Sequence, residues 1–241
     1  MMTLDLQKTT EFDCPYCAKS KLAPQRKADR KLVMINSLSP EHRKHHETSQ
    51  DGDETEVHTF ALELECTNPE CRMVTIVLGR LDAYPDYSGH VREYDTTTTP
   101  RFFYPPIDVL PVPSYIPNDI RRELQRSYAL YFADPAAAAN PLRSAVEYFM
   151  DAAGVVKKRD GHRLSLHKRL VEFKKVNAYI AKLLVAVKWL GNDGSHYGYG
   201  LTQEDLLKAY EVFLYAMGKW FDNLELRVEG HASHISKGRG C

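Results

Sequence analysis

Two segments in the first hundred residues alternate between apolar and polar side chains. Val57 to Glu65 is the first of these segments, and Arg72 to Arg80 is the second. The alternating apolar residues are Phe60, Leu62 and Leu64 in the first, and Val74, Ile76 and Leu78 in the second. A period of two is typical of strands with one buried face. We therefore predict a pair of β-strands in which these residues face the core.

Two segments next to these strands lack such a pattern. Residues 19–56 form a long insert rich in charged side chains and histidines, and we expect a solvated loop there. Residues 96–117 begin with four threonines and contain six prolines. Proline disfavours helix and stiffens extended chain, so this second segment is predicted to be a connector.

From Asn118 onward the apolar residues recur at helical spacing. We predict five helices, which run from 118 to about 132, from 135 to about 153, from 166 to 175, from 178 to about 190, and from 203 onward. Pro141 either restarts the second helix, with Asn140 as cap, or kinks it. Ser165 and Thr202 are the expected N-caps of the third and fifth helices.

The last helix carries the widest apolar face. One row consists of Leu206, Tyr210, Phe213, Met217, Trp220 and Leu224, and a second row consists of Leu207, Leu214 and Phe221. A face of this width suits a bundle core together with a dimer seam. The sequence thus predicts an α+β protein with a β module at 1–95, a connector at 96–117, a helical domain at 118–228 and a disordered tail at 229–241.

Charge and hydropathy narrow the functional classes. Lys+Arg and Asp+Glu both number 32, so the net charge gives no overall attraction to nucleic acid or to membranes. No stretch is long and apolar enough for a signal peptide or a membrane-spanning helix. Five cysteines in such a chain suggest a reducing compartment, and we expect a cytoplasmic protein.

Four of the cysteines form two close pairs. They are Cys14 with Cys17, and Cys66 with Cys71, and the second pair lies between the two predicted strands. Two tight turns of this kind can bring four thiolates to one tetrahedral ion. Alternatives are a redox Cys-x-x-Cys or unrelated buried cysteines, but the second pair and the absence of a βαβ pattern disfavour the redox motif. The sequence predicts a structural zinc site of the zinc-ribbon type, with Cys241 outside it.

Three separated motifs in the helical part resemble a bacterial family catalogued only as domain of unknown function 4145. The resemblance covers roughly residues 114–222. It rests on Ile116-Pro117 with the following helix, Asp134-Pro135-Ala136-Ala137-Ala138 leading into Arg143-Ser144-Ala145-Val146-Glu147, and Gly191-Asn192-Asp193-Gly194-Ser195-His196 followed by Thr202-Gln203-Glu204-Asp205. By composition alone the stretch from Gly191 to Gly200 is predicted to be a polar turn between two helices.

That family looks like a branch of the HEPN superfamily, whose helical domains are commonly dimeric and occur in restriction, toxin–antitoxin and phage-defence proteins. Catalytic members cleave RNA without metal, through an arginine and a histidine that meet their dimer mates at a cleft. The resemblance implies His196 as the histidine and Asn192 as the polar residue one helical turn before it. The imidazole of histidine has an ordinary pKa near neutral, which suits proton transfer at physiological pH.

This chain departs from that pattern because no arginine immediately precedes His196. Lys188 is the nearest cation upstream, but an ammonium lacks the bidentate fork of a guanidinium. Arg143 on the second helix is the other candidate for the phosphate-binding charge. Glu147, one turn later, either orients Arg143 or simply pairs with it.

Three hypotheses follow. The first is a HEPN-like, nucleic-acid-associated protein of a bacterial defence or stress system, with endoribonuclease activity and RNA as its partner. The second is a non-enzymatic module that dimerises and binds a partner protein of such a system. The third, a zinc-dependent hydrolase, is disfavoured because no His-Glu-x-x-His or comparable open-site spacing occurs.

Overall fold

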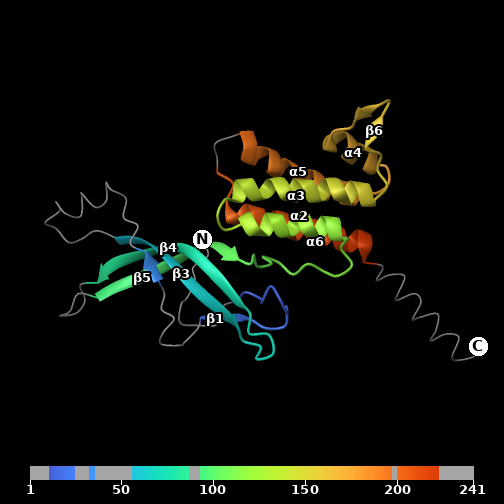
Figure 1. The fold of residues 1–241 in the computed structure, drawn as a ribbon. Helices are drawn as coiled ribbons and strands as arrows, with labels where there is room; N and C mark the ends of the chain where they lie inside the picture. Colours follow the sequence, from blue (N-terminus) through green and yellow to red (C-terminus); the bar gives the residue numbers. More distant parts are fainter. Residues whose placement is uncertain (1–10, 25–32, 36–55, 87–92, 197–199, 223–241) are drawn as a thin grey trace, which may run out of the picture. The chain divides into compact units, whose positions relative to one another are not determined.

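The computed structural model describes residues 11–24, 33–35, 56–86, 93–196 and 200–222, and for Gly191 to His196 it describes the backbone alone. The chain divides into two compact units, Met1–Val109 with Tyr128–Asp134, and Leu110–Ser127 with Pro135–Cys241. The first unit is built on an antiparallel sheet and the second on helices (Figure 1). The protein therefore has the α+β class that the sequence predicts.

The first unit contains a curled sheet (Figure 1) with the strand order β1-β3-β4-β5, and β2 also pairs with β3. The strands are β1 (Leu22–Pro24), β2 (Val33–Ile35), β3 (Glu56–Cys66), β4 (Val74–Asp86) and β5 (Glu93–Tyr104). Both short strands fall within the segment predicted as a solvated insert. Leu22 is completely buried, which explains why part of that segment joins the sheet. The remaining insert residues, 25–32 and 36–55, lie outside the described residues.

The predicted buried face is confirmed for β3 and wrong for β4. Phe60, Leu62 and Leu64 are buried, but Ile76 and Leu78 on β4 are 42% and 41% exposed. Directly opposite residues of antiparallel strands share a face, and the register places Phe60 opposite Gly79 and Leu62 opposite Val77. Both faces of β4 are apolar in this region, so the alternation alone does not show which face is buried, and the predicted face is the exposed one.

The connector begins later than predicted, because β5 takes in residues 96–104. Threonine suits a strand, and the four threonines pair with β4 from Ala83 to Arg80. Pro100 is accommodated at an irregularity, where Leu78 pairs with Phe102 and Gly79 pairs with Pro100. A bulge is one of the few places in a sheet that tolerate proline.

Gly79 lets the Phe60 ring pack against the sheet. A Cβ atom at this position would lie 2.3 Å from the Thr99 carbonyl oxygen and 2.6 Å from the Phe60 ring. We expect Gly79→Ala to destabilise the first unit by about 1–3 kcal/mol, because neither the backbone nor the buried ring can move freely. Gly200→Ala is the matched control, since a Cβ there meets nothing within 4 Å. Urea unfolding monitored on the strands measures the difference, and equal midpoints for the two variants would contradict this packing.

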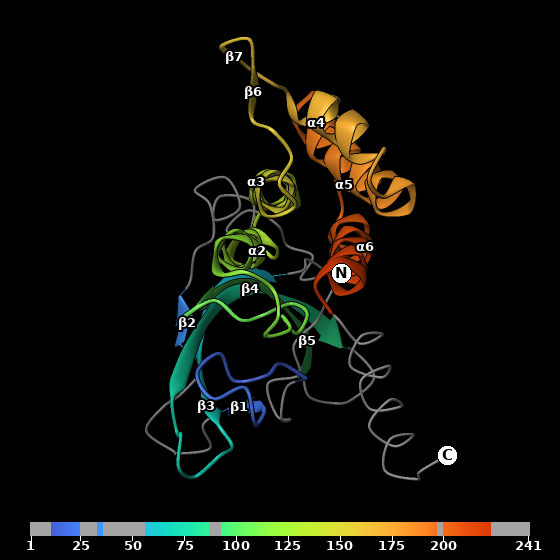
Figure 2. The same cartoon turned by 90° about the vertical axis from the view of Figure 1, so that its right-hand side faces the viewer.

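The described part of the second unit contains four whole helices, α2 up to Ser127, and a small hairpin. The helices are α2 (Asn118–Leu130), α3 (Pro135–Ala152), α4 (Leu166–Phe173), α5 (Ala178–His196) and α6 (Gln203–Phe221), and the hairpin consists of β6 (Lys158–Arg159) and β7 (His162–Arg163). Figure 2 shows α2 and α3 in one layer and α4, α5 and α6 in another. Within them, α5 packs against α3, α4 and α6.

Most helix boundaries agree with the predictions. Ser165 caps α4, and Thr202 forms a capping box with Asp205 at the start of α6. Pro141 lies inside α3, which runs as one helix and does not restart there. The predicted core row of α6 is buried at Leu206, Tyr210, Phe213 and Met217. Leu224 and the predicted tail at 229–241 lie outside the described residues.

The predicted polar turn after α5 is wrong for its first six residues, because the helix continues to His196. A helical glycine costs only about 1 kcal/mol relative to alanine. Extending an existing helix adds a hydrogen bond per residue without a new nucleation step, so a glycine-containing segment can follow a strong helix. His196 therefore ends a helix, whereas the sequence had suggested a loop.

A buried polar network links three of these helices. The Ser127 hydroxyl of α2 donates to the Ala138 carbonyl of α3 at 2.6 Å and lies 2.6 Å from the Tyr210 hydroxyl of α6. All three residues are fully or almost fully buried. Such a satisfied network fixes how the helices pack. None of the described helices combines the length and apolar character needed to cross a membrane.

Candidate metal centre and helical site

The four cysteines predicted as ligands lie on two similar turns. In the first turn, the Ala18 N–H donates to the Cys14 carbonyl at 2.9 Å. In the second, the Arg72 N–H donates to the Asn68 carbonyl at 3.0 Å. Ala18 and Arg72 directly follow Cys17 and Cys71, and both have left-handed backbones, with φ of 50° and 47°. Each turn therefore folds back tightly enough to present two sulfur atoms on one side.

Pairing between β1 and β3 brings the two turns together. Leu22 pairs with Cys66, and the Thr67 N–H donates to the Lys21 carbonyl at 3.0 Å. The Asn68 N–H also donates to the Cys66 sulfur at 3.4 Å. Backbone donors of this kind support a thiolate and hold its orientation. Long-range strand pairing thus positions cysteines that are about fifty residues apart in sequence.

The sulfur atoms are arranged as metal ligands and not as disulfides. All four Sγ atoms lie within 4.8 Å of one another. Cys14 Sγ is 3.8 Å from Cys71 Sγ, and Cys17 Sγ is 3.6 Å from Cys66 Sγ. Sulfur atoms about 2.3 Å from a common tetrahedral centre lie about 3.8 Å apart, whereas a disulfide bond is about 2 Å long. The geometry therefore fits one ion held by four thiolates.

The protein sets the acidities of these thiols unequally. The backbone N–H of Lys19 lowers the pKa of Cys17 to about 6, whereas burial raises the pKa of Cys66 to about 12. Cys14 and Cys66 are buried, and Cys17 and Cys71 are half-buried. A metal ion binds the deprotonated form, so binding at neutral pH must release the Cys66 proton. Four thiolates also fill a tetrahedral shell, which leaves no position for a substrate.

In the helical unit, two of the predicted site residues lie close enough to interact. Lys188 of α5 is only 6% exposed, and its Nζ lies 3.8 Å from the centroid of the Trp189 ring. Burial lowers the pKa of Lys188, and the positive charge of Arg143 on α3 lowers it further. Among the described residues, no carboxylate forms an ion pair with Lys188. A buried cation beside a second cation is electrostatically unfavourable unless an anion joins them.

Glu147 makes contacts that the sequence did not predict, while its predicted role in orienting or pairing with Arg143 stays a prediction. Its Oε2 accepts a hydrogen bond from Arg163 of β7 at 3.1 Å. Its backbone carbonyl accepts a hydrogen bond from Arg169 of α4 at 3.3 Å. Glu147 therefore helps to connect α3 with the hairpin and α4.

Asn192 and His196 occupy the last two turns of α5. Their side chains lie outside the described residues. The backbone nevertheless sets their spacing, because Lys188, Asn192 and His196 follow one another at steps of four residues along one helix. Positions four apart on an α-helix share a stripe.

A group of polar residues surrounds the β6–β7 hairpin and was not predicted from the sequence. Asp160 and Gly161 have φ of 51° and 77°, which suits a tight hairpin turn. An Asp-Gly pair flanked by basic residues was the available signal for that turn. Arg169 gave no such signal, because a single arginine on a predicted helix looks like an ordinary surface charge.

Comparison with known proteins gave two family matches. No curated protein and no solved structure matches the chain. The model of domain of unknown function DUF8608 matches residues 2–103. Residues 125–237 match the model of domain of unknown function DUF4145, which is the family that the three helical motifs had indicated.

Proposed function

We propose that the helical unit is a HEPN-like RNA-binding module of a bacterial defence or stress system, and that it cleaves RNA without a catalytic metal. The observation that carries this proposal is the burial of Lys188 beside the positive charge of Arg143, with no carboxylate of the described residues in an ion pair with Lys188. An RNA phosphate would supply a negative charge next to Lys188. Phosphate neutralisation by lysine and arginine is the main source of affinity in nucleic-acid binding.

The spacing along α5 connects this charge with a proton-transfer group. Lys188, Asn192 and His196 follow one another at four-residue steps. In this proposal Lys188 and Arg143 hold the scissile phosphate, and Asn192 orients the ribose or the histidine. His196 takes the proton of the 2′-hydroxyl or gives a proton to the leaving oxygen, which a near-neutral imidazole can do at physiological pH.

A second copy of the chain would complete the site, as in the dimeric HEPN arrangement. Exposed aromatic residues on α5 and α6 support an apolar contact between copies. Trp189 is 51% exposed, and Tyr179 and Tyr215, which contact each other edge to face at 6.4 Å, are 55% and 49% exposed. Aromatic side chains are enriched in the cores of protein interfaces.

We also propose zinc as the metal of the four-cysteine centre, with a structural role. Four thiolates in a tetrahedral arrangement are the donor set of structural zinc sites. The described cysteines form no disulfide, which suits a reducing compartment, and we therefore propose a cytoplasmic location.

Replacing Lys188 with methionine tests the RNA site directly. Methionine keeps the length and removes the charge, so we expect RNA affinity to fall about tenfold or more through the loss of a charge-assisted phosphate contact. We expect the unfolding midpoint to stay the same or rise, because a buried charge is removed. Lys182→Met on the exposed face of the same helix is the control, with unchanged affinity. Fluorescence anisotropy with a short RNA measures affinity, and equal affinities for both variants would contradict the proposal.

The pH dependence of stability gives the same variant a second readout. The pKa of Lys188 is lowered from 10.5 in the folded state, so the unfolded chain binds this proton more strongly. The contribution of Lys188 to stability therefore rises as pH increases from the folded pKa toward 10.5. Lys188→Met should lack this rise, and the difference between the two proteins isolates it from other titrating groups.

A second candidate function, partner binding by the sheet, rests on a separate observation. Ile76 lies opposite Tyr104, and Leu78 lies opposite Phe102, so the four side chains share the exposed face of β4 and β5. Phe102 is 53% exposed and Tyr104 is 76% exposed. An apolar patch on an edge strand can dock another protein. A wild-type protein that binds no RNA but loses an interaction when Phe102 is changed to serine would favour this function.

A further inference from the structure

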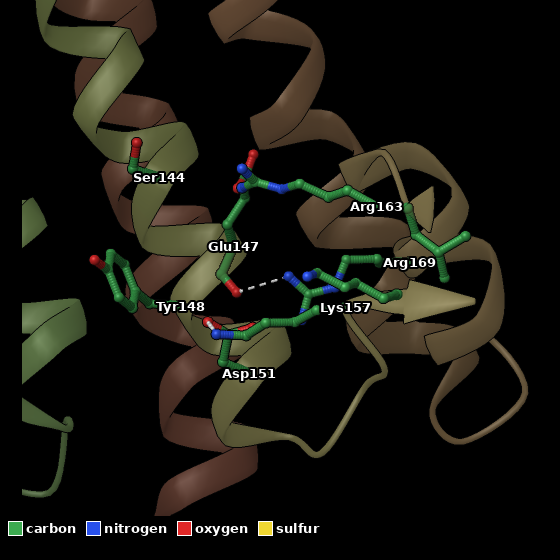
Figure 3. A pocket seen from close by; sticks show the side chains of 9 residues that line it. Ser144, Glu147, Tyr148, Asp151, Lys157, Arg163 and Arg169 are labelled. Atoms are coloured by element: carbon green, nitrogen blue, oxygen red, sulfur yellow. Dashed lines mark hydrogen bonds and ion pairs between the residues drawn. The ribbon is translucent and has the colours of Figure 1, made fainter. Parts of the chain in front are cut away.

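The helical unit contains a second polar site, a pocket between α3, the hairpin and α4. Its volume is about 500 Å³, within the usual range for small-molecule sites. The residues that line it are Ser144, Glu147, Tyr148, Asp151, Lys157, Lys158, Arg163, Leu164 and Arg169. Figure 3 shows side chains of α3 on one side, with the arginines and Lys157 reaching toward them. Among the predicted catalytic residues whose side chains the structure describes, Glu147 is in this set.

Charge balance in the pocket leaves room for an anion. The Asp151 carboxylate forms ion pairs with Lys157 at 2.7 Å and with Arg169 at 2.6 Å. The Glu147 carboxylate forms an ion pair with Arg163 at 3.1 Å. Lys157 and Arg169 hold the pKa of Asp151 below its ordinary value, although burial alone would raise it. The lining therefore has four cationic side chains and two carboxylates. Two positive charges remain unbalanced, which matches the charge of a phosphate monoester.

Arg169 is the fixed element of this pocket. It is 5% exposed, and its guanidinium donates to the Glu147 carbonyl, to Asp151 and to the Val155 carbonyl at 2.9 Å. Its Nε is buried and has no hydrogen-bond partner among the described residues. Leaving a buried donor unsatisfied is costly, and the three acceptors around Arg169 already fix its guanidinium in place, so its positive charge stays at this pocket. Two arginines and two lysines that line one pocket are typical of phosphate recognition.

Tyr148 adds a feature that a bare phosphate site does not need. Its aromatic ring lines the same pocket. The guanidinium of Arg122, on α2, lies 5.8 Å from the centroid of this ring. Any of the nucleobases can stack on an aromatic ring, because each has a flat π-face. A pocket of this volume also exceeds what a phosphate group alone would fill.

We propose that this pocket binds the phosphate of a nucleoside monophosphate unit, either a free nucleotide or the 5′ end of an RNA. Lys158 and Arg163 contact the phosphate from the hairpin, Arg169 adds its fixed positive charge, and Tyr148 stacks on the base. The site is separate from the α5 stripe and does not depend on the proposed RNA cleavage.

Binding measurements on the full-length protein test this assignment. The probes are AMP, a short RNA with a 5′-phosphate, the same RNA with a 5′-hydroxyl, and succinate as a dianion without a phosphate. We expect calorimetry to detect binding of AMP or of the 5′-phosphorylated RNA, and no comparable binding of succinate. AMP binding identifies a free nucleotide as the source, whereas binding that needs the 5′-phosphorylated RNA identifies an RNA end.

Charge-reversal variants then locate the ligand. Lys158→Glu and Arg163→Glu change exposed side chains, so the fold should survive, and we expect each to weaken binding about tenfold or more. Lys168→Glu makes the same charge change on the exposed face of α4, outside the pocket, and should change affinity less than about twofold. Equal weakening by all three variants, equal binding of succinate, or no phosphate ligand bound at about 10 mM would overturn the proposal.

Discussion

In a protein with Cys66 replaced by serine, we expect the metal to be lost and the sheet of the first unit to unfold. Cys66 ends β3, pairs with Leu22 of β1, and holds its sulfur 3.6 Å from that of Cys17. Removing it takes away one of four ligands at the point where the two turns meet. Structural zinc contributes about 10–16 kcal/mol of apparent binding free energy in small domains, which exceeds the stability of most sheets of this size.

Metal content and strand content should fall together in this variant. Plasma mass spectrometry on tag-free protein should give one zinc per wild-type chain and close to none in Cys66→Ser. Circular dichroism should show loss of strand signal with the helical signal retained. Cys241→Ser is the control, because the sequence analysis places Cys241 outside the ligand set. A Cys66→Ser protein with a folded sheet, or a wild-type protein with a folded sheet and no metal, would rule out the metal centre.

In a protein with His196 replaced by alanine, we expect RNA cleavage to fall by about 10²–10⁴-fold, the usual contribution of a general acid or base. The fold should be retained, because His196 is the last residue of α5, whereas Ile180, Leu184 and Val187 are buried and anchor that helix in the core. RNA affinity should change little, since in this account Lys188 and Arg143 supply the binding charge. Single-turnover cleavage and anisotropy on the same preparation separate the two effects.

His167→Ala is the matched control for His196→Ala, because His167 is an exposed histidine on α4. If His196 only stabilises the end of its helix, its removal should lower stability by about 1 kcal/mol and leave any activity unchanged. A lower melting temperature with unaltered cleavage would therefore exclude His196 from the chemistry. Light scattering on both variants should show the same oligomeric state as the wild type, which the proposed function predicts to be a dimer.

The sequence predicted best those features that local patterns determine. The cysteine turns have short internal spacings, so their sulfur pairs could be identified without knowing the fold. The caps at Ser165 and Thr202 were predictable because a capping side chain bonds to a backbone N–H only two or three residues away. The buried face of β3 followed from a clear alternation of apolar and polar residues.

Features that depend on contacts distant in sequence could not be predicted in this way. The face of β4 is decided by its register with Phe60, and both of its faces are apolar. The continuation of α5 past Leu190 runs against its glycine-rich composition. The Arg169–Asp151–Lys157 cluster joins α4, the end of α3 and the segment before the hairpin, and each of these residues by itself looks like an ordinary surface charge.

The proposed ribonuclease function is tested most directly by the chemistry of RNA cleavage by the wild-type chain. Purified full-length protein should be incubated briefly with end-labelled RNA in the presence of EDTA, with its zinc content measured in parallel. If the helical unit is the proposed ribonuclease, EDTA should not stop cleavage, and the products should carry 2′,3′-cyclic phosphate ends, because the 2′-hydroxyl would be the nucleophile. RNA that remains intact, or cleavage that requires an added divalent metal, would contradict this function.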